Sequence, residues 1–496
     1  MQRRNFLKSM SLVSAWFGTP AIVSKAAGDK STSAGELILQ GKVQSNRKGI
    51  AGVVVTDGRS VVVTDKNGQY KFNSYEEAEF VYISIPSGYA FPTNNGVAAF
   101  YAPIPKRNGV VVNNFTLEKL KTDDNRHQFV VWADTQMISK ADCEQLKKES
   151  VPDLKALVQS YGNEALFHGI GCGDLVWDKF DLFTDYKEAI QMTGIPFYNV
   201  IGNHDMDIDS RTDDYSAQTF KQQFGPTYYS FNRGQIHYVV LDDVFFVGTA
   251  KRYIGYINES QLKWLERDLQ WVKPGTTVVV SVHIPTNTGA IRRKKIKEEF
   301  GGTVSNRKQL YKLLRPYKVH IMSGHTHFNE SWEEDNIMEH NHGTVCGAWW
   351  TGPICSDGTP SGYGVYEVEG SELKWYYKST GKEESHQLRV YEKGRHKDFP
   401  EEVVANVWNW DPKWKVEWYE DNVLKGTMEQ RIAFDPWAVE LYEGPQLPKK
   451  HKFVEPSLAD HLFFAKPSAG AREIMVKATD RFGNVYREII QLEPKV

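Results

Sequence analysis

Five short stretches of the sequence place a side chain that could bind a metal ion directly after an apolar run. In chain order they read VVWADTQ, GIGCGDL, NVIGNHD, VVSVHIP and HIMSGHTH. Carboxylate and carboxamide oxygens and imidazole nitrogens are all ligands for divalent metals. One His-x-His pair would carry little weight, because most histidines in a long chain lie on the surface or in the core. Five such stretches together predict a metal-dependent active site.

Each stretch must lie at the end of a buried strand. Between residues 126 and 382, apolar strands such as VVVSVHIP alternate with helical segments such as ESQLKWLERDLQWV, where Leu262, Leu265 and Leu269 recur at helical spacing. This alternation predicts an α/β domain. Because α/β sheets bind ligands at the carboxyl ends of their strands, the five loops are predicted to meet there.

The order Asp, Gly-Asp, Gly-Asn-His-Asp, His and Gly-His-x-His resembles that of the calcineurin-like metallophosphoesterases. The resemblance implies a β-sandwich core flanked by helices. It also implies two divalent metal ions, either manganese, iron or zinc, bridged by the carboxylate of Asp174. The implied ligands of the first ion are Asp134, Gln136 and His327, and those of the second are Asn203, His283 and His325.

In this family a hydroxide that bridges the two ions attacks phosphorus, so no protein nucleophile is required. The resemblance makes His204 the residue that stabilises the transition state or protonates the leaving oxygen. Asp205 is expected to support His204 by a hydrogen bond that fixes its tautomer and raises its pKa. The alternative for Asp205 is a carboxylate that caps the turn.

Gln136 departs from the family's usual first stretch, which is Asp-x-His. A carboxamide oxygen is a poorer donor than an imidazole nitrogen. The sequence therefore predicts a weaker first metal site and a preference for harder ions such as manganese or iron.

Two later segments are candidates for substrate recognition. In GAWWTGPICSDGTPSGYGVY, Trp349 or Trp350 and Tyr363 could form a stacking wall for a sugar or base, or could pack against the C-terminal part of the chain. In IRRKKIKEE, Arg292 and Arg293 could bind a second phosphate. The alternation of Lys and Glu that follows is also typical of a solvated helix face.

The flanking regions read as β-rich. We expect an N-terminal β-sandwich at residues 36–120, because short β-branched runs are separated by Asp-Gly and Asn-Gly turns. Its TDKNGQY turn resembles that of transthyretin-like or Ig-like modules. The catalytic α/β domain is expected at residues 126–382 and a C-terminal all-β domain at residues 386–496.

Residues 1–27 resemble an export signal. The segment has a basic start, an apolar stretch and a small-residue end, and Arg3 and Arg4 are typical of the twin-arginine route, with an ordinary secretory signal as the alternative. We expect a periplasmic or secreted protein without a membrane span, because no later segment offers about twenty apolar residues in a row. Pairing of Cys346 with Cys355 is left open.

The 496 residues carry 60 basic and 62 acidic side chains and a formal net charge of −2, so composition gives no sign of nucleic-acid binding. We predict an exported metallophosphoesterase that acts on a phosphorylated small molecule or a phosphate-linked polymer. Phosphodiester or pyrophosphate bonds are favoured over phosphomonoesters. The alternative is an exported glycan- or partner-binding protein with a degenerate metal site. The oligomeric state is left open.

Overall fold

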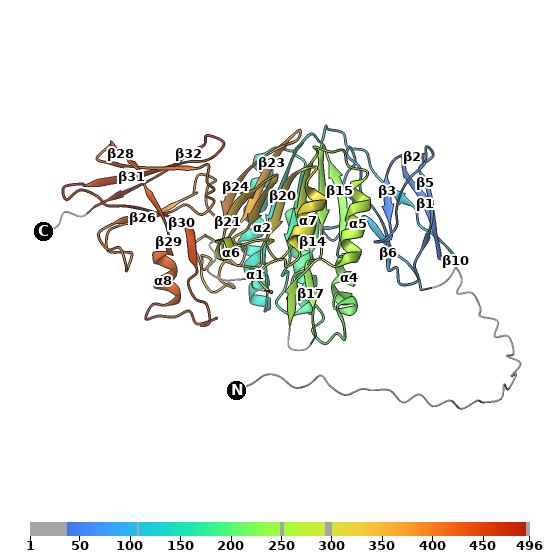
Figure 1. Cartoon of the computed structure of the whole chain (residues 1–496), viewed down its shortest axis with the longest axis horizontal. Coiled ribbons are helices and arrows are strands. Elements are labelled where there is room, and N and C mark those ends of the chain that lie inside the picture. Colours follow the sequence, from blue (N-terminus) through green and yellow to red (C-terminus); the bar gives the residue numbers. More distant parts are fainter. Residues whose placement is uncertain (1–36, 107–108, 249–251, 293–299, 493–496) are drawn as a thin grey trace, which may run out of the picture.

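The computed structural model describes residues 37–106, 109–248, 252–292 and 300–492. The predicted export signal, residues 1–27, lies outside the described residues. Three regions follow one another along the longest axis of the molecule, with the N-terminal region (residues 37–120) at one end and the C-terminal region (residues 386–492) at the other (Figure 1). The central region, residues 126–382, lies between them.

Two large sheets form the central region. The seven-stranded sheet has the order β24 (Glu372–Ser379), β23 (Gly362–Glu369), β12 (Arg126–Trp132), β13 (Phe167–Cys172), β14 (Phe197–Val200), β8 (Val97–Ala98) and β7 (Thr93–Asn94). The six-stranded sheet has the order β15 (Tyr229–Arg233), β16 (Ile236–Val240), β19 (Thr277–Ser281), β20 (Lys318–Ser323), β22 (Ile337–Asn341) and β21 (Glu330–Glu334). In each sheet the strands that precede the predicted site loops run parallel to one another.

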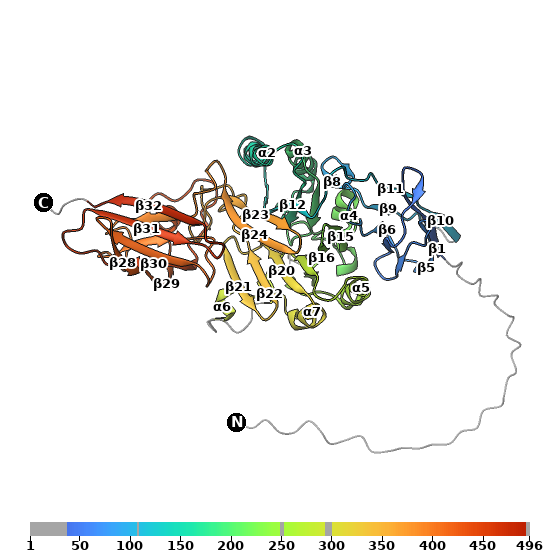
Figure 2. The ribbon, with the colours of Figure 1, turned by 90° about the horizontal axis from the view of Figure 1, so that it is seen from above.

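Helices cover the outer faces of these sheets, so that the sheets form a sandwich between two helical layers (Figure 2). The helices of the central region are α1 (Lys140–Lys148), α2 (Ser150–Ser160), α3 (Phe183–Thr193), α4 (Gln218–Phe224), α5 (Glu259–Leu269), α6 (Gly289–Arg292) and α7 (Arg307–Leu314). A two-stranded hairpin joins β17 (Val244–Phe246) to β18 (Tyr253–Gly255). Helix α5 is the one expected from leucine spacing: the side chain of Asn258 accepts a hydrogen bond from the Gln261 amide at its start, and Leu265 and Leu269 are buried.

The N-terminal region consists of two small sheets. The first joins β1 (Leu37–Ser45) to β2 (Lys48–Gly49), β5 (Gln69–Ser74), β10 (Gly109–Val112) and β11 (Phe115–Thr116). The second has the order β4 (Val61–Val63), β3 (Val54–Thr56), β6 (Phe80–Ile83) and β9 (Tyr101–Pro103). Strand β8 leaves this region and pairs in parallel with β14, so the N-terminal region extends the seven-stranded sheet of the central one.

The C-terminal region is a second β-sandwich with one added helix. One sheet has the order β25 (Arg389–Tyr391), β26 (Val403–Asn406), β30 (Leu458–Ala465) and β29 (Glu429–Phe434). The other has the order β28 (Val423–Thr427), β27 (Lys415–Glu420), β31 (Glu473–Thr479) and β32 (Val485–Gln491). Helix α8 (Pro436–Tyr442) was not expected in a region whose sequence reads as strands, and its N-terminus is capped by Asp435.

Within the described parts of the chain, no helix is long and apolar enough to cross a membrane. Cys346 and Cys355 are both buried as free thiols. Thr344 lies between them, since its amide donates to the Cys355 sulfur at 3.4 Å and its hydroxyl lies 3.5 Å from the Cys346 sulfur.

Candidate metal centre

All predicted ligands lie just beyond the carboxyl ends of five parallel strands. Strands β12, β13 and β14 come from one sheet and β19 and β20 from the other, and their loops meet at the same end of the sandwich. The ligands follow these strands in order: Asp134 and Gln136, Asp174, Asn203, His283, and His325 and His327. The fold therefore brings together residues that are far apart in sequence.

The backbone at these residues is strained. Asp134, Gln136, Asp174, His325 and His327 have φ angles of 49°, 35°, 47°, 70° and 56°. Such left-handed conformations cost residues other than glycine about 1–3 kcal/mol each and concentrate at functional sites. These backbone conformations could not be predicted from the sequence, because neither Asp nor His requires a positive φ.

Two of the glycines in these loops are required by close approach. A Cβ atom on Gly202 would lie 2.0 Å from the Asp174 amide nitrogen, and one on Gly324 would lie 2.5 Å from Asp134 Oδ2. Any side chain at these positions would displace a predicted ligand. This explains why a glycine comes directly before both the Asn-His-Asp and the His-x-His stretches.

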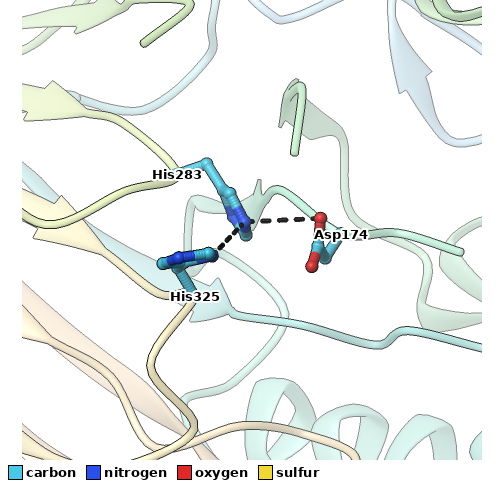
Figure 3. A group of neighbouring side chains, drawn as sticks. All are labelled: Asp174, His283 and His325. Carbon is cyan, nitrogen blue, oxygen red and sulfur yellow. Dashed lines mark hydrogen bonds and ion pairs between the residues drawn. The ribbon is translucent and has the colours of Figure 1, made fainter. Parts of the chain in front are cut away.

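Asp174, His283 and His325 form a compact cluster (Figure 3). The Nε2 atom of His283 lies 3.3 Å from Asp174 Oδ1 and 3.2 Å from His325 Nδ1. It also lies 3.1 Å from the side-chain oxygen of Asn203.

The tautomer of His283 leaves a lone pair on the ring nitrogen that faces the cluster. Its Nδ1 lies 3.0 Å from the carbonyl oxygen of Cys172 and donates to it, and burial lowers the pKa of the ring. His283 is therefore neutral, and its Nε2 presents a lone pair. A carboxylate, a carboxamide oxygen and a second imidazole surround this lone pair, and together these groups are the donor set of a divalent cation.

A second group of donors lies beside the first. His327 Nε2 is 3.6 Å from Asp134 Oδ1, and His327 Nδ1 faces the Gly347 carbonyl at 3.3 Å. Burial lowers the pKa of His327 to about 4, so this ring is neutral as well. Gln136 donates from Nε2 to Asp174 Oδ2 at 2.9 Å, and its Oε1 is buried without a hydrogen-bond partner. An unpartnered buried oxygen on a side chain that touches Asp174 fits a second cation.

The electrostatics of the carboxylates agree with this donor set. Burial and the neighbouring charge of Asp174 raise the pKa of Asp134 well above its usual range. The buried carboxylates of Asp134 and Asp174 repel each other unless positive charge lies between them. The residues therefore fit a site for two metal ions.

His204 lies at the edge of the donor groups. Its amide donates to Asp174 Oδ1 at 2.8 Å, and its Nδ1 lies 3.1 Å from Asp178 Oδ1. Burial by itself would lower the pKa of His204, but the charge of Asp174 and the hydrogen bond to Asp178 raise it above its usual value. The ring is thus favoured in its protonated form.

The predicted hydrogen bond from Asp205 to His204 is wrong, although the charge of Asp205 is one of the causes that raise the pKa of His204. The carboxylate of Asp205 is buried and accepts hydrogen bonds from three backbone amides, those of Leu175, Val176 and Gly202, at 2.9–3.1 Å. It therefore holds two of the site loops together, which is the alternative of a capping carboxylate. Asp178, four residues after Asp174 in the same loop, occupies the supporting position instead.

The three aromatic candidates behave differently. Trp349 stacks on His327 with ring centroids 4.0 Å apart, so it belongs to the site. Trp350 is buried and its Nε1 donates to the Thr135 carbonyl at 2.8 Å. Tyr363 is fully buried and donates to Asp153 at 2.7 Å. The prediction of a stacking wall is therefore wrong for Trp350 and Tyr363, because both are packed inside the central region.

The side chain of Arg292, at the end of α6, and all of Arg293 lie outside the described residues.

Sequence reasoning missed several neighbours of the site. Trp177 and Asp178 follow Asp174 in the same loop, and this proximity was the available signal. Tyr253 lies edge-to-face with His325 at 5.9 Å, and the sequence carries no sign of this contact. His451 and Phe453 reach Trp177 from the C-terminal region, at 5.3 and 5.9 Å between ring centroids.

A two-sheet α/β sandwich with these donors at its strand ends defines a metal-binding hydrolase domain. Three models of calcineurin-like phosphoesterases match the chain: that of the N-terminal part at residues 37–120, that of the phosphoesterase itself at residues 127–329, and that of the C-terminal part at residues 339–486. The chain belongs to the calcineurin-like phosphoesterase family, and membership implies a metal-dependent phosphoesterase with a dinuclear metal site.

Solved structures with similar folds include a dimetal phosphatase from Danio rerio, with 13% identity, a TM-score of 0.36, and coverage of 51% of this chain and 96% of that one. Purple acid phosphatase PPD1 from yellow lupin (Lupinus luteus) seeds has 14% identity, a TM-score of 0.37, and coverage of 66% and 67%. GAP50, the anchor in the inner membrane complex of Plasmodium, has 14% identity, a TM-score of 0.34, and coverage of 52% and 85%. No curated protein matches the chain.

Proposed function

We propose that this protein hydrolyses a phosphodiester or pyrophosphate bond, with two divalent metal ions held at the centre described above. The observation that carries the proposal is the cluster of Asp174, Asn203 and His325 around His283 Nε2, together with the unpartnered Oε1 of Gln136. The oxygens of Asp174 and Asn203 are acceptors that face the lone pair of His283 Nε2, whereas buried polar atoms in an ordinary core pair a donor with an acceptor.

The residues divide naturally into two ligand sets. Asp134, Gln136 and His327 would hold the first ion, and Asn203, His283 and His325 the second. Asp174 would serve both, because one of its oxygens faces His283 and the other faces Gln136. The use of neutral Asn and Gln oxygens leaves the ions with net positive charge, which an anionic phosphoester requires.

When bound, the two ions supply Lewis acidity and activate the water that attacks phosphorus. The chain's own residues orient the substrate's phosphate and protonate the leaving oxygen. His204, supported by Asp178, is positioned to donate a hydrogen bond to a phosphate oxygen and to pass a proton to the leaving oxygen. Trp349 holds the ring of His327 in place by stacking and excludes water from one side of it.

The first test is hydrolysis of bis-p-nitrophenyl phosphate and of p-nitrophenyl phosphate with manganese, iron, zinc or a chelator. We expect metal-dependent turnover that the chelator removes, higher rates on the diester, and loss of activity by several orders of magnitude in Asp174→Ala. The exposed Asp181→Ala is the matched control and should keep full activity. If the protein binds metal by calorimetry but turns over neither ester, the proposal gives way to the glycan- or partner-binding alternative.

Gln136 provides a second test, because its carboxamide is the weaker donor in the first ligand set. We expect a metal titration to resolve two unequal affinities in the native protein. Gln136→His should bring the weaker affinity closer to the stronger one and increase the affinity for zinc relative to manganese. Two equal affinities that the substitution leaves unchanged would contradict this role of Gln136.

We also infer that residues 1–27 direct export. A fusion of these residues to a reporter that is active only after export tests the inference, and Arg3→Lys with Arg4→Lys tests the twin-arginine route. Export that persists in the double variant would assign the ordinary secretory route instead.

A further inference from the structure

A segment of the C-terminal region, residues 449–455, reaches the metal centre. Val454 is buried in a small apolar cluster with Ala348 and Ile354 of the central region. The amide of His451 donates to the hydroxyl oxygen of Thr351 at 3.0 Å. The segment is therefore held against the same loop that carries Trp349.

This contact creates a continuous group of rings that we call the aromatic rim, made of Trp177, Trp349, His451 and Phe453. The ring centroids of Trp177 lie 5.3 Å from His451, 5.9 Å from Phe453 and 6.3 Å from Trp349. Phe453 in turn lies 5.3 Å from both Trp349 and His451. Distances of this kind are typical of aromatic clusters in direct contact.

The aromatic rim touches the site at two points. Trp177 lies 5.6 Å from the ring of His204, and Trp349 stacks on His327. His204 is the proposed proton donor, and His327 is a proposed metal ligand. A group attached to a phosphate bound between them would emerge onto the rim.

The rim is not fully covered by the protein. Phe453 is 54% exposed, and Trp177 and Trp349 are only partly buried. Exposed aromatic surface beside a polar catalytic centre is typical of a ligand-binding site. By contrast, Trp350 in the same loop is buried and hydrogen-bonded, so it has no free face to offer.

We propose that the aromatic rim binds a planar ring carried by the substrate next to the scissile phosphate, so that the substrates are phosphoesters with an aromatic or nucleobase-like group. The proposal rests on the function proposed above. Stacking of a ring on aromatic side chains strengthens binding in other proteins enough to select such substrates.

The experiment compares two phosphonates that the enzyme cannot hydrolyse, 2-phenylethylphosphonate and ethylphosphonate, by calorimetry on the manganese-loaded full chain. Both present the same anionic group to the metal centre, and only the first carries a ring. We expect the ring to tighten binding about tenfold, corresponding to about 1.4 kcal/mol. Phe453→Ala and Trp177→Leu should bring the ratio of the two dissociation constants close to one, and Phe453→Ala, which does not touch His204 or His327, should leave the value for ethylphosphonate unchanged.

Two further variants serve as controls. Phe453→Tyr keeps a ring and should keep the ratio. Phe434→Ala makes the same truncation at another partly exposed phenylalanine of the C-terminal region and should also keep it.

A ratio that Phe453→Ala and Trp177→Leu both leave unchanged would overturn the aromatic rim as a subsite, and the rings would then only join the two regions. If ethylphosphonate binds and the phenyl group adds nothing, the rim proposal fails while the metal centre stands. If neither phosphonate binds the metal-loaded protein, the function proposed above fails, and the rim proposal fails with it.

Discussion

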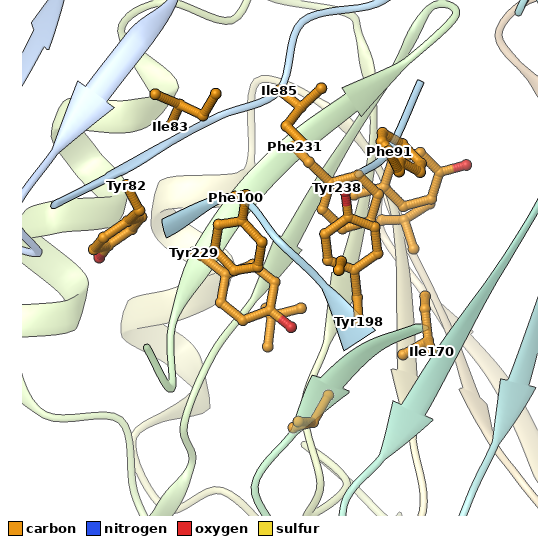
Figure 4. Close-up of a cluster of buried hydrophobic side chains, with 14 of the residues drawn as sticks. Tyr82, Ile83, Ile85, Phe91, Phe100, Ile170, Tyr198, Tyr229, Phe231 and Tyr238 are labelled. Atoms are coloured by element: carbon orange, nitrogen blue, oxygen red, sulfur yellow. The ribbon is translucent and has the colours of Figure 1, made fainter. Parts of the chain in front are cut away.

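The two flanking regions are both β-rich, yet they join the central region in opposite ways. The N-terminal region shares its core with the central sheets: Ile85, Phe91 and Phe100 lie among Tyr198, Tyr229, Phe231 and Tyr238 (Figure 4). The C-terminal region instead has two larger cores of its own, one of which contains Trp414, Val416 and Trp418, and shares only a small cluster with the central region. The first region therefore supports the fold of the centre, whereas the second is a separate unit placed against it.

The contact between the C-terminal and central regions has an apolar part, which includes Ala348, Ile354 and Val454, and a buried polar part around Asp357. Asp357 of the central region lies 3.0 Å from His461 Nε2, and Asn406 lies 2.8 Å from His461 Nδ1. The amide of Asn329, two residues after His327, donates to the same carboxylate of Asp357 at 2.8 Å. This buried polar network links the metal-centre loop to the C-terminal region. A buried polar contact tolerates less displacement than an apolar one, because each buried polar group must keep its hydrogen-bond partner.

The largest effect is expected from breaking the shared core. Phe100→Ala removes a buried ring that lies 4.4 Å from Tyr229 and 5.8 Å from Tyr198. We expect a loss of about 3–5 kcal/mol in the free energy of unfolding. Because the core is shared, calorimetry should show the N-terminal and central regions unfolding together at a lower temperature, with activity lost in the same transition.

The matched substitution in the C-terminal region is Phe463→Ala, which removes a buried ring from a core that the central region does not share. Its transition should shift by itself, while the transition that carries metal-dependent activity stays in place. If the two variants shift the same transition, the contrast between the flanking regions is wrong.

A smaller effect is expected from breaking the polar network. Asp357→Ala would leave His461 and the Asn329 amide without their acceptor, and we expect a cost of about 2–3 kcal/mol. Since the aromatic rim depends on the position of the C-terminal region, the substitution should also raise KM for aryl esters more than it changes kcat. Asp357→Asn, which keeps the shape, serves as the control and should have the smaller effect on KM.

The smallest effect is expected from pH. Burial by itself would lower the pKa of His461, but its hydrogen bond to Asp357 and the charge of Asp357 raise it above the usual value. A group whose pKa is raised by folding stabilises the folded state below its unfolded pKa of about 6.5, and this contribution is lost as the pH rises through the folded pKa.

The C-terminal transition should therefore move to lower temperature as the pH rises above about 6.5. His461→Gln should remove this dependence, and thermal unfolding at a series of pH values measures it. If the unfolding temperature of His461→Gln still falls as the pH rises, another group causes the pH dependence.

The order of ligand residues along the chain was sufficient to predict the metal centre. Asp174, His283 and His325 are close in space because each directly follows a parallel strand, and parallel strands present their carboxyl ends at one edge. The α/β architecture with β-rich flanks could be predicted for a similar reason, since apolar periodicity is a local property of the sequence.

The supporting residues could not be predicted in this way. Asp205 is adjacent to His204 in the chain, yet it binds backbone amides, and His204 is supported by Asp178 from another loop. Trp349 and Trp350 are neighbours with opposite roles, because consecutive residues point in different directions. Each outcome depends on the path of a loop, which nothing in the local sequence specifies.

The sequence alone therefore determined which residues could bind metal and that strands would carry them to one place, since both follow from residue chemistry and strand periodicity. Only the tertiary structure decided that Asp178 supports the imidazole of His204 and that Trp349, not Trp350, stacks on His327. It also decided that Phe453, 279 residues after Asp174 in the chain, contacts Trp177 in the loop that follows Asp174. These are contacts between distant parts of the chain, and their geometry is set by the packing of whole regions rather than by any local pattern.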